Sequence, residues 1–430
     1  MEAEIRTANP KRRRSDSLQS SWYPYYAGYS ETFARTALSS AEIPKDGWVL
    51  DPWNGSGTTT SSAISLGFDT YGYDLNPVMV LVAMARSLDP AEYPSLKPLS
   101  ASICRSAKSA PEITQDDPLL AWLVPSSVAA ARGIEYSIQK LLIDDRKYSP
   151  LRSRQIGEVS DLAAFFYIAL FRTLRKILGS FLTSNPTWTK KPRSPQARVR
   201  PASQDVRSVF REELNEMLPQ GQKIEPYTAP GQKVLAVASS DRLPLPAECV
   251  ACVLASPPYC TRIDYAVATE IELAILGYSL DGEFDDLRRN LIGTTTVPKE
   301  YPSAPPQLGT TCLRFLDRLA EHPSKASSTY YLKNHLQYFH SIRASLAEIS
   351  RVMRPKARCT LVVQDSFYKD LHNDLPKIFV EMAAHQHLEL IKRQDFPLSR
   401  TMAGINPGAN GYRKSFSATE SVLSFTKRPA

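Results

Sequence analysis

The sequence predicts an α/β protein with a doubly wound, Rossmann-like sheet and a mostly helical insertion. Three observations predict this class. Short apolar runs alternate with helical stretches over residues 21–100, as in a parallel sheet with crossover helices. The same alternation resumes over residues 233–430. Between them, over residues 101–232, apolar residues recur at helical spacing, so we expect an insertion that interrupts one sheet.

The first part of the sheet is expected to contain two strands that each end at an aspartate. An aromatic segment beginning at Trp22 leads into a short helix that ends near Ser40. The elements expected next are a strand at Trp48–Leu50 before Asp51, a helix at Thr58–Leu66, a strand at Thr70–Tyr73 before Asp74, and a helix at Pro77–Ser87.

The remaining elements follow from the same periodicities. In the insertion we expect helices at Leu119–Leu142 and Asp161–Leu182, then an exposed basic loop at Asn185–Pro201. In the second part of the sheet we expect strands at Lys233–Ala238, Cys249–Ala255 and Cys359–Gln364, helices at Tyr338–Met353 and Leu371–His385, and closing strands at Leu388–Lys392 and Ser421–Thr426.

Composition narrows the classes of function. The 430 residues carry 52 Lys and Arg against 44 Asp and Glu, a net charge of +8. This sign suits a polyanionic partner, although a basic surface without a partner would give the same balance. Six cysteines are too few for a disulfide scaffold, and Cys249 and Cys252 form a single C-x-x-C within an apolar strand. The six histidines lack metal-ligand spacing, so no metal is predicted.

The N-terminal residues 1–20 are predicted to form a flexible basic tail. The run Lys11–Arg14 could touch phosphates or could simply be solvated. The tail has no apolar core of a secretory signal. The most apolar helical stretch, Leu162–Leu182, carries Arg172 and Arg175, so no membrane span is expected. These features predict a cytoplasmic protein.

A glycine-rich turn, Asp51–Thr59, is the first candidate for a binding site. It follows a strand and opens a helix, which is where open α/β sheets bind ligands. Gly55 and Gly57 allow close approach of a ligand, and the helix amides can meet a carboxylate. Asp74, at the end of the next strand, could accept both hydroxyls of a ribose or could cap the following helix. The incomplete G-x-G-x-x-G pattern favours a nucleoside-bearing cofactor other than a dinucleotide.

The turn Ser256–Tyr259 is the second candidate. Its two prolines fix the backbone and remove two amide donors, which makes the turn a rigid acceptor. The Ser256 hydroxyl and the Pro257 carbonyl could accept hydrogen bonds from an amino group, while Tyr259 could stack on a ring. Such a site suits an aromatic amine that is oriented toward an electrophile. Cys260 is expected to be structural.

Together these turns resemble those of the amino-methyltransferases of DNA, which act on cytosine N4 or adenine N6. The cofactor loop of that family reads D-P-F-x-G-S-G-T-T, and its catalytic loop reads S-P-P-Y, N-P-P-Y or D-P-P-Y. Asp51–Thr59 matches the first with Trp53 in place of phenylalanine, and Ser256–Tyr259 matches the second. The resemblance covers roughly residues 21–95 and 233–370.

Three further segments extend this resemblance. Ser240–Pro246 is similar to the acidic segment that contacts adenine, and Tyr338–Pro355 is similar to the helix before the fifth strand. The aromatic segment Trp22–Ser30 resembles the one that contacts the methionine end of the cofactor.

The resemblance implies a methyltransferase fold with S-adenosylmethionine as cofactor, its cofactor part in residues 21–100 and its catalytic part in residues 233–430. By the likeness, Asp51, Gly55 and Gly57 would hold the methionine portion of the cofactor, and Pro52, Trp53 and Thr58 complete this loop. Asp74 would hold the ribose, and Asp241 would hold the adenine. The target base would be held by Ser256, Pro257, Pro258 and Tyr259.

The target base is expected to be cytosine, with adenine as the alternative. Serine at the first catalytic position is typical of cytosine-N4 enzymes, although many of these place the catalytic loop before the glycine loop, the reverse of the order here. An amino group inside a duplex is inaccessible, so a site-specific DNA methyltransferase would act on a base flipped out of the duplex. The resemblance also implies a nucleoid-associated enzyme of a restriction-modification type, possible partners being a nuclease or defence protein.

Two regions could contact nucleic acid. The first is the insertion with its basic loop, which holds Lys190, Lys191, Arg193, Arg198 and Arg200. The second is Asp285–Lys299, with Arg288 and Arg289. Each could instead be ordinary solvated surface.

Three other functions remain open. An RNA amino-methyltransferase would use a similar turn, although such enzymes usually carry an attached RNA-binding module that is not evident here. A non-enzymatic DNA-binding or defence subunit could retain the fold, but it need not keep Asp51, Asp74 and both turns intact. A nicotinamide oxidoreductase lacks an identifiable set of hydride-transfer residues.

Overall fold

The computed structural model describes most of the chain. The described residues are 8–11, 21–24, 28–107, 111–144, 148–151, 153–183, 189–218, 227, 229–260, 263–300, 303–398 and 418–429. The predicted basic tail, apart from residues 8–11, lies outside them, as do Tyr25, Tyr26 and Asn185–Trp188.

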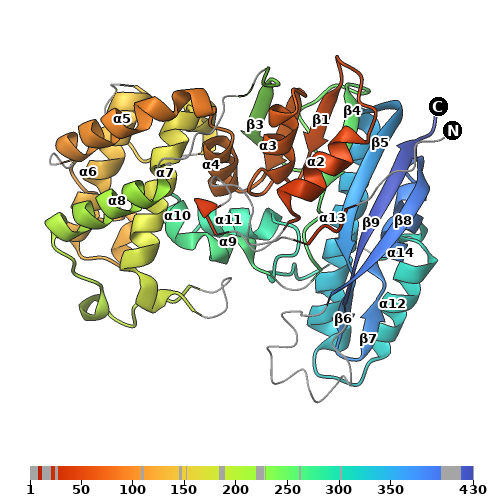
Figure 1. Ribbon diagram of the computed structural model, residues 1–430. Coiled ribbons are helices and arrows are strands. Elements are labelled where there is room, and N and C mark those ends of the chain that lie inside the picture. Colours follow the sequence, from red (N-terminus) through yellow and green to blue (C-terminus); the bar gives the residue numbers. More distant parts are fainter. Residues whose placement is uncertain are drawn as a thin grey trace.

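A seven-stranded sheet forms the centre of the molecule (Figure 1). Its strands in chain order are β1 (Trp48–Asp51), β2 (Thr70–Asp74), β3 (Lys233–Val237), β4 (Val250–Ala255), β5 (Met353–Gln364), β8 (Leu388–Leu398) and β9 (Ala418–Lys427). Their spatial order is β3-β2-β1-β4-β5-β9-β8. The pairs from β3 to β5 are parallel, while β9 is antiparallel to both of its neighbours. The predicted α/β class with a doubly wound, Rossmann-like sheet is confirmed.

The strand order reverses between β1 and β4. From β1 the chain builds outward through β2 to β3, and it then returns to place β4 on the other side of β1. Such a switch point leaves a crevice at the carboxyl ends of the two strands, where ligands bind in open α/β sheets. Asp51 ends β1, and Ser256 follows the last residue of β4, so both predicted turns border this crevice.

Helices cover both faces of the sheet. Alternate residues of a strand point to opposite faces. On one face Val49 and Cys252 pack with α2 (Glu31–Ser39) and α3 (Thr58–Ser65). On the other, Leu50 and Val253 pack in a core formed with α12 (Thr310–Glu321), α13 (Leu332–Val352) and α14 (Leu375–Ala384).

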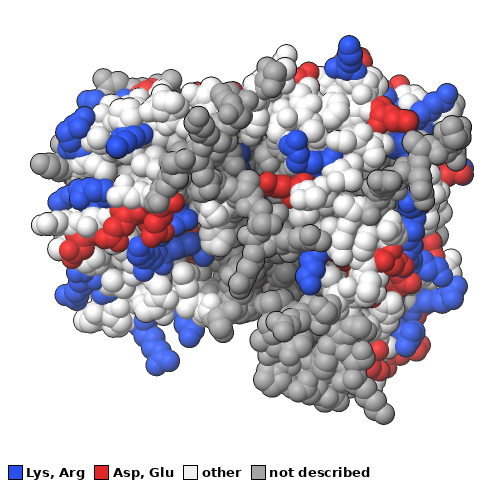
Figure 2. Space-filling model, in the orientation of Figure 1, with Lys and Arg blue, Asp and Glu red and all other residues white. Residues whose placement is uncertain are grey.

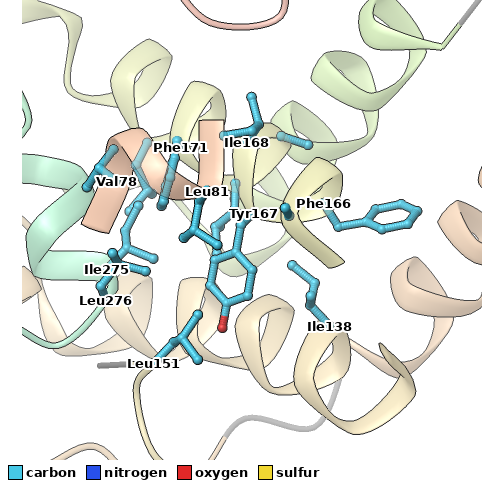
Figure 3. Packing of buried hydrophobic residues seen from close by; sticks show 14 of the residues in the cluster. Val78, Leu81, Ile138, Leu151, Phe166, Tyr167, Ile168, Phe171, Ile275 and Leu276 are labelled. Atoms are coloured by element: carbon cyan, nitrogen blue, oxygen red, sulfur yellow. The ribbon is translucent and has the colours of Figure 1, made fainter. Parts of the chain in front are cut away.

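A helical body lies beside the β3 end of the sheet (Figure 1). It contains α5 (Tyr93–Ser106), α6 (Pro125–Leu142), α7 (Asp161–Ile177) and α8 (Ser203–Met217). Helix α4 (Pro77–Arg86) joins it to the sheet, and all residues of α4 are buried because both parts cover it. In Figure 3, Val78 and Leu81 of α4 pack with Ile168 and Phe171 of α7.

Three short helices follow the Ser256–Tyr259 turn: α9 (Tyr265–Ala268), α10 (Glu270–Ile275) and α11 (Glu283–Asn290). Arg132 of α6 is buried and donates to the Ala274 and Ile275 carbonyls at 3.0 and 2.5 Å. It also pairs with Asp117 at 2.8 Å and Glu135 at 2.6 Å. The helical body thus caps the carboxyl end of α10.

Two more cations of the helical body bind acidic side chains of α10. Arg175 of α7 pairs with the fully buried Glu272, to which Tyr23 also donates at 2.9 Å. Lys191 pairs with the buried Glu270 at 2.8 Å. The predicted insertion and the segment after the Ser256–Tyr259 turn therefore form one packed unit.

Several predicted element boundaries were wrong. Residues 371–373, predicted as helix, form β7 (Leu371–Asn373), which pairs with β6 (Ser366–Tyr368) in a small hairpin. Helix α14 begins only at Leu375, because Asp374 caps it and a proline occupies its first turn. Likewise α6 begins at Pro125 rather than at 119, and α7 ends at Ile177 before Gly179. Helices α5 and α8 to α12 were not predicted.

No helix among the described residues is long and apolar enough to cross a membrane.

Candidate active site

One pocket at the switch point joins the two predicted turns. Its lining comes from the N-terminal segment, the glycine loop and the end of β4, and it consists of Gly28, Tyr29, Asp51, Trp53, Asn54, Gly55, Ser56, Thr58, Thr59 and Ser256. The first residue of the predicted catalytic turn therefore shares a cavity with most of the predicted cofactor loop.

The glycine loop needs its glycines for conformation and for packing. Gly55 has φ +48° and Gly57 has φ +78°, values that side-chain-bearing residues rarely adopt. A Cβ on Gly57 would lie 2.8 Å from the Cβ of Ala83 and 2.9 Å from its Cα, so the loop also passes directly against α4. Gly57 is the N-cap of α3, and the first two residues of that helix, Thr58 and Thr59, line the pocket.

Asp51 holds the loop from inside. Its carboxylate accepts hydrogen bonds from the Trp53 amide at 3.0 Å and from the Thr59 hydroxyl at 2.5 Å. The Tyr29 hydroxyl lies 2.5 Å from the same Thr59 oxygen, which ties the N-terminal segment to the loop. Burial raises the pKa of Asp51 to about 7, and the charge of Asp74 adds to the rise while the two hydrogen bonds oppose it.

Asp74 fixes the neighbouring strand end. Its two oxygens accept hydrogen bonds from the amides of Gly55 at 2.9 Å and Asn76 at 2.8 Å. Burial raises its pKa to about 6. The cap of α4 is Asn76, whose side chain accepts from the Val78 amide at 3.1 Å. Asp74 is therefore not the helix cap that was one reading of the sequence, and its carboxylate borders the glycine loop.

Arg86 is a site residue that the sequence reasoning missed. It is buried and donates to the Ser56 carbonyl at 2.8 Å and to the Ser56 hydroxyl at 2.6 Å, and it pairs with Glu31 at 3.1 Å. It therefore fixes the glycine loop from α4. The signal in the sequence was a single cation within the otherwise apolar stretch Pro77–Ser87.

The Ser256 hydroxyl has its proton directed away from the pocket. It donates to the Val362 carbonyl of β5 at 3.1 Å, so its lone pairs remain available as acceptors. The Tyr338 hydroxyl of α13 donates to the Pro258 carbonyl at 2.9 Å, which braces the turn. Within the described part of the chain, no group donates to the Pro257 carbonyl. Of the four residues of the turn, Ser256 lines the pocket, and Pro257, Pro258 and Tyr259 are not in its lining.

Tyr259 and Cys260 complete the turn. The Tyr259 amide donates to the Tyr265 hydroxyl at 3.3 Å. Burial raises the pKa of Tyr259 to about 12, and the charge of Glu420 contributes. Burial likewise raises the pKa of Cys260 to about 12, and Asn373 donates to its sulfur at 3.7 Å. A neutral, packed thiol fits the expected structural role of Cys260.

Asp241 lies at the same edge of the sheet, but not in the lining of the pocket. It is exposed in the segment after β3 and accepts from Ser239 at 2.6 Å. Helix α13 holds this segment: the Ser240 and Ser345 hydroxyls are 2.8 Å apart, and Glu348 accepts from the Leu243 amide at 3.0 Å. The same helix braces the catalytic turn through Tyr338.

The N-terminal aromatic residues divide between two places. Tyr29 lines the pocket. Trp22 and Tyr23 are instead buried in the helical body, where the Trp22 indole donates to the Met217 carbonyl at 3.0 Å. These two residues anchor the segment rather than line the site.

The basic residues predicted to contact nucleic acid differ in their partners. Lys190, Arg193 and Arg200 are exposed and, like the partly exposed Arg198, form no ion pair within the described ranges. Lys191 is paired with Glu270, Arg288 with Asp264 at 2.6 Å, and Arg289 with Asp286 at 2.9 Å. On the face shown in Figure 2, basic side chains of the helical body are interspersed with an acidic strip rather than forming one positive surface.

The described residues contain no group of three or more His, Cys, Asp and Glu side chains that could hold a metal ion.

No protein-family model matches the chain, and no curated protein matches it in sequence. Among solved structures, it is similar to a SAM-dependent methyltransferase from Methanosarcina mazei, with 9% identity over 91% of this chain and 98% of the other, at a TM-score of 0.31. It is also similar to geranyl diphosphate methyltransferase in complex with GPP and sinefungin, with 9% identity over 93% and 78% of the two chains, at a TM-score of 0.31.

A third similar structure, provisionally described as a DNA modification methylase from Thermus thermophilus, shows 13% identity over 27% of this chain and 51% of the other, at a TM-score of 0.19. Likenesses this distant do not bear on cofactor or substrate, which only the residues of this chain can indicate.

Proposed function

We propose that this chain is an S-adenosylmethionine-dependent DNA methyltransferase that modifies the exocyclic amine of a flipped base, N4 of cytosine. One observation carries the proposal: the glycine loop and Ser256 line the same pocket at the switch point of the sheet. A cofactor held by the loop would therefore meet an acceptor held by the Ser256–Tyr259 turn without a domain movement.

The residues of the loop fit this cofactor. Gly55 lines the pocket, and Gly57 lets the loop pass against α4 and lead into the first turn of α3, whose amides suit the carboxylate of the methionine portion. The Asp74 carboxylate, which is fixed by two amides, retains lone pairs for the ribose hydroxyls. Asp51 shapes the loop from beneath through Trp53 and Thr59, and Asp241 would meet the adenine. When bound, S-adenosylmethionine supplies an electrophilic methyl group on a sulfonium ion.

The acceptor turn fits an aromatic amine. Such an amine has two hydrogens to donate, and the turn offers two acceptors, the Ser256 hydroxyl oxygen and the Pro257 carbonyl oxygen. Because the Ser256 proton already binds the Val362 carbonyl, this hydroxyl accepts from the amine. Both acceptors stabilise the positive charge that develops on nitrogen, and they turn its lone pair toward the pocket. The Tyr259 ring would stack on the base.

The preference for cytosine rests on the resemblance, in which serine at the first catalytic position is typical of cytosine-N4 enzymes; adenine N6 is the alternative. The preference for DNA rests on the same resemblance and on the cations Lys190, Arg193, Arg198 and Arg200, which have no ion-pair partner among the described residues. They are suited to phosphates and would not read sequence.

The test is a transfer assay with radiolabelled S-adenosylmethionine. The purified chain is incubated with duplex DNA or with total RNA, and the modified nucleoside is identified by mass spectrometry. We expect N4-methyldeoxycytidine from DNA. Detection of N6-methyldeoxyadenosine would show that the target base is adenine. Label in RNA alone would show that the substrate is RNA and not DNA. Absence of cofactor binding in calorimetry would contradict any methyltransferase function.

A further inference from the structure

Glu420 is a buried carboxyl group at the carboxyl edge of the sheet, outside the lining of the pocket itself. Strand β9 runs antiparallel to β5, so its first residues lie at the carboxyl edge of the sheet, where the ligand crevice is. Glu420 is in register with Gln364, the last residue of β5, and with Phe396 of β8. Only 8% of its surface is exposed.

The strand register brings Glu420 toward the catalytic turn. The Ser256 hydroxyl binds the carbonyl of Val362, and Val362 is paired with Val422. Glu420 is two residues from Val422 on β9, so it lies on the same face and about 7 Å farther toward the crevice. The turn continues in this direction, and Tyr259 lies close enough to Glu420 for the charge of the carboxylate to raise the pKa of the phenol.

The described residues offer Glu420 no hydrogen bond and no ion pair. The other carboxylates at this edge are satisfied: Asp51 and Asp74 bind amides, and Asp365 binds the Thr419 amide and His372. Glu420 differs from all three.

We propose that Glu420 is a base-recognition residue that hydrogen bonds to the ring nitrogen beside the amino group undergoing methylation. This inference rests on the proposed function. Ser256 and Pro257 would occupy the two amine hydrogens, and the next atom on the same edge is an acceptor nitrogen, N3 of cytosine or N1 of adenine. A neutral carboxyl group donates to that nitrogen. Since the amine itself remains unprotonated, its lone pair stays available.

Two further points support this role. Burial raises the pKa of Glu420 to about 7, so a substantial fraction carries the proton near neutral pH. A donor at this position also discriminates against guanine, whose ring nitrogen N1 carries a hydrogen, because two donors would face each other.

The test removes the ring nitrogen from the substrate. A duplex carrying the methylation site mapped in the transfer assay is prepared with cytosine or with 3-deazacytosine at the target position (1-deazaadenine if adenine is methylated). We expect kcat/KM of the unaltered protein to fall about 10- to 100-fold on the deaza substrate. With the natural base, Glu420→Ala should lower kcat/KM by a similar factor. With the deaza base, the same substitution should lower kcat/KM little further, because the hydrogen bond is already absent there.

Glu420→Gln keeps a donor of the same shape and should stay within a few-fold of the unaltered protein on the natural base. Glu389→Gln, an exposed position on β8, is the matched control. Calorimetry with S-adenosylhomocysteine checks that each variant still folds and binds the cofactor product. Additive losses, or an unaltered protein that is insensitive to the deaza base, would overturn the assignment, and the second result needs no variant. Failure of the proposed function would be seen separately, as no transfer to the natural base.

Discussion

The two sides of the pocket are held in place in different ways. On the cofactor side, Asp51 and Asp74 bind amides and a hydroxyl of the loop Trp53–Thr59 and of Asn76, all close in sequence. On the acceptor side, Ser256 binds Val362 and Pro258 binds Tyr338, each at a separation of at least 80 residues. The proposed cofactor side is thus shaped mostly by residues 29–86, with one distant hydrogen bond from Thr59 to the Leu254 carbonyl, whereas the proposed acceptor side is shaped by the rest of the fold.

The largest effect is expected at the acceptor side. Ser256→Ala removes one of two acceptors that meet the amine, so kcat should fall about 100- to 1000-fold. The affinity for S-adenosylmethionine should stay nearly unchanged, because the loop is held by its own contacts. Single-turnover transfer and calorimetry measure the two effects. Ser95→Ala, at an exposed position of α5, is the control, and a parallel loss of cofactor affinity in Ser256→Ala would contradict the separation of the two sides.

The reverse pattern is expected at Asp74. Asp74→Asn removes the charge that accepts the ribose hydroxyls, so cofactor affinity should fall about 10- to 100-fold. In the proposed complex the hydroxyls would bind the ionised carboxylate of Asp74, whose pKa is raised to about 6. The contribution of Asp74 to affinity should therefore be full well above pH 6 and should be lost as the pH falls through about 6.

Calorimetry at several pH values measures this decline. Asp74→Asn should remove part of it, and the remainder should follow Asp51, whose pKa is about 7. A pH profile identical to that of the unaltered protein would show that Asp74 does not contact the cofactor.

A smaller effect is expected from the brace on the catalytic turn. Tyr338→Phe leaves the Pro258 carbonyl without its donor and should lower kcat about 3- to 10-fold, with cofactor affinity unchanged. Tyr330→Phe, in the turn before α13, serves as the control for loss of a tyrosine hydroxyl. Equal effects of the two substitutions would show that the brace does not position the turn.

The smallest effects are expected at the basic loop. Ala at Lys190, Arg193 or Arg200 should weaken DNA binding a few-fold each, because each of these cations would neutralise one phosphate. For every phosphate that is no longer neutralised, the slope of log K against log salt should become shallower by about 0.9. Fluorescence anisotropy at several salt concentrations measures both the affinity and the slope.

Lys191→Ala provides a contrast within the same loop. Because Lys191 neutralises the buried Glu270, its loss should lower the free energy of unfolding, with little change in the salt slope. Thermal melting measures the stability. Equal salt slopes for Arg193→Ala and the unaltered protein would show that this loop does not contact DNA.

The cofactor side could largely be predicted from sequence because its contacts are local. Strands ending at Asp51 and Asp74, and helices beginning near Thr58 and Pro77, agree with the structure within a residue or two. Apolar periodicity and glycine placement determine such elements, and both are visible in one stretch of chain. Arg86 was missed because its partners, Ser56 and Glu31, lie on other elements.

On the proposed acceptor side, the motif could be predicted from sequence, but the contacts that hold it in place could not. The motif Ser256–Tyr259 is readable, whereas its support by Val362, Tyr338 and Tyr265 depends on which strands and helices become neighbours. Glu420 gave no signal, since it lies in an ordinary strand sequence and gains its character only from burial. Strand β7 was predicted as the first turn of a helix because Leu371 fits the apolar pattern of the residues that follow, whereas the helix begins only after its cap, Asp374.

The contacts between the helical body and α10 limit which segments of this chain can be exchanged with those of another protein. Replacing residues 101–232 by a foreign segment would remove Arg175 from Glu272 and Lys191 from Glu270, and the loss should cost about 3–5 kcal/mol at the fully buried Glu272 and less at Glu270, whose partner is about half exposed. It would also remove Arg132 from the carboxyl end of α10, the helix that follows α9, which holds Tyr265 against Tyr259. Residues 101–232 can therefore not be exchanged on their own. A chimera must keep the equivalents of Arg132, Arg175 and Lys191, or must replace Glu270 and Glu272 as well.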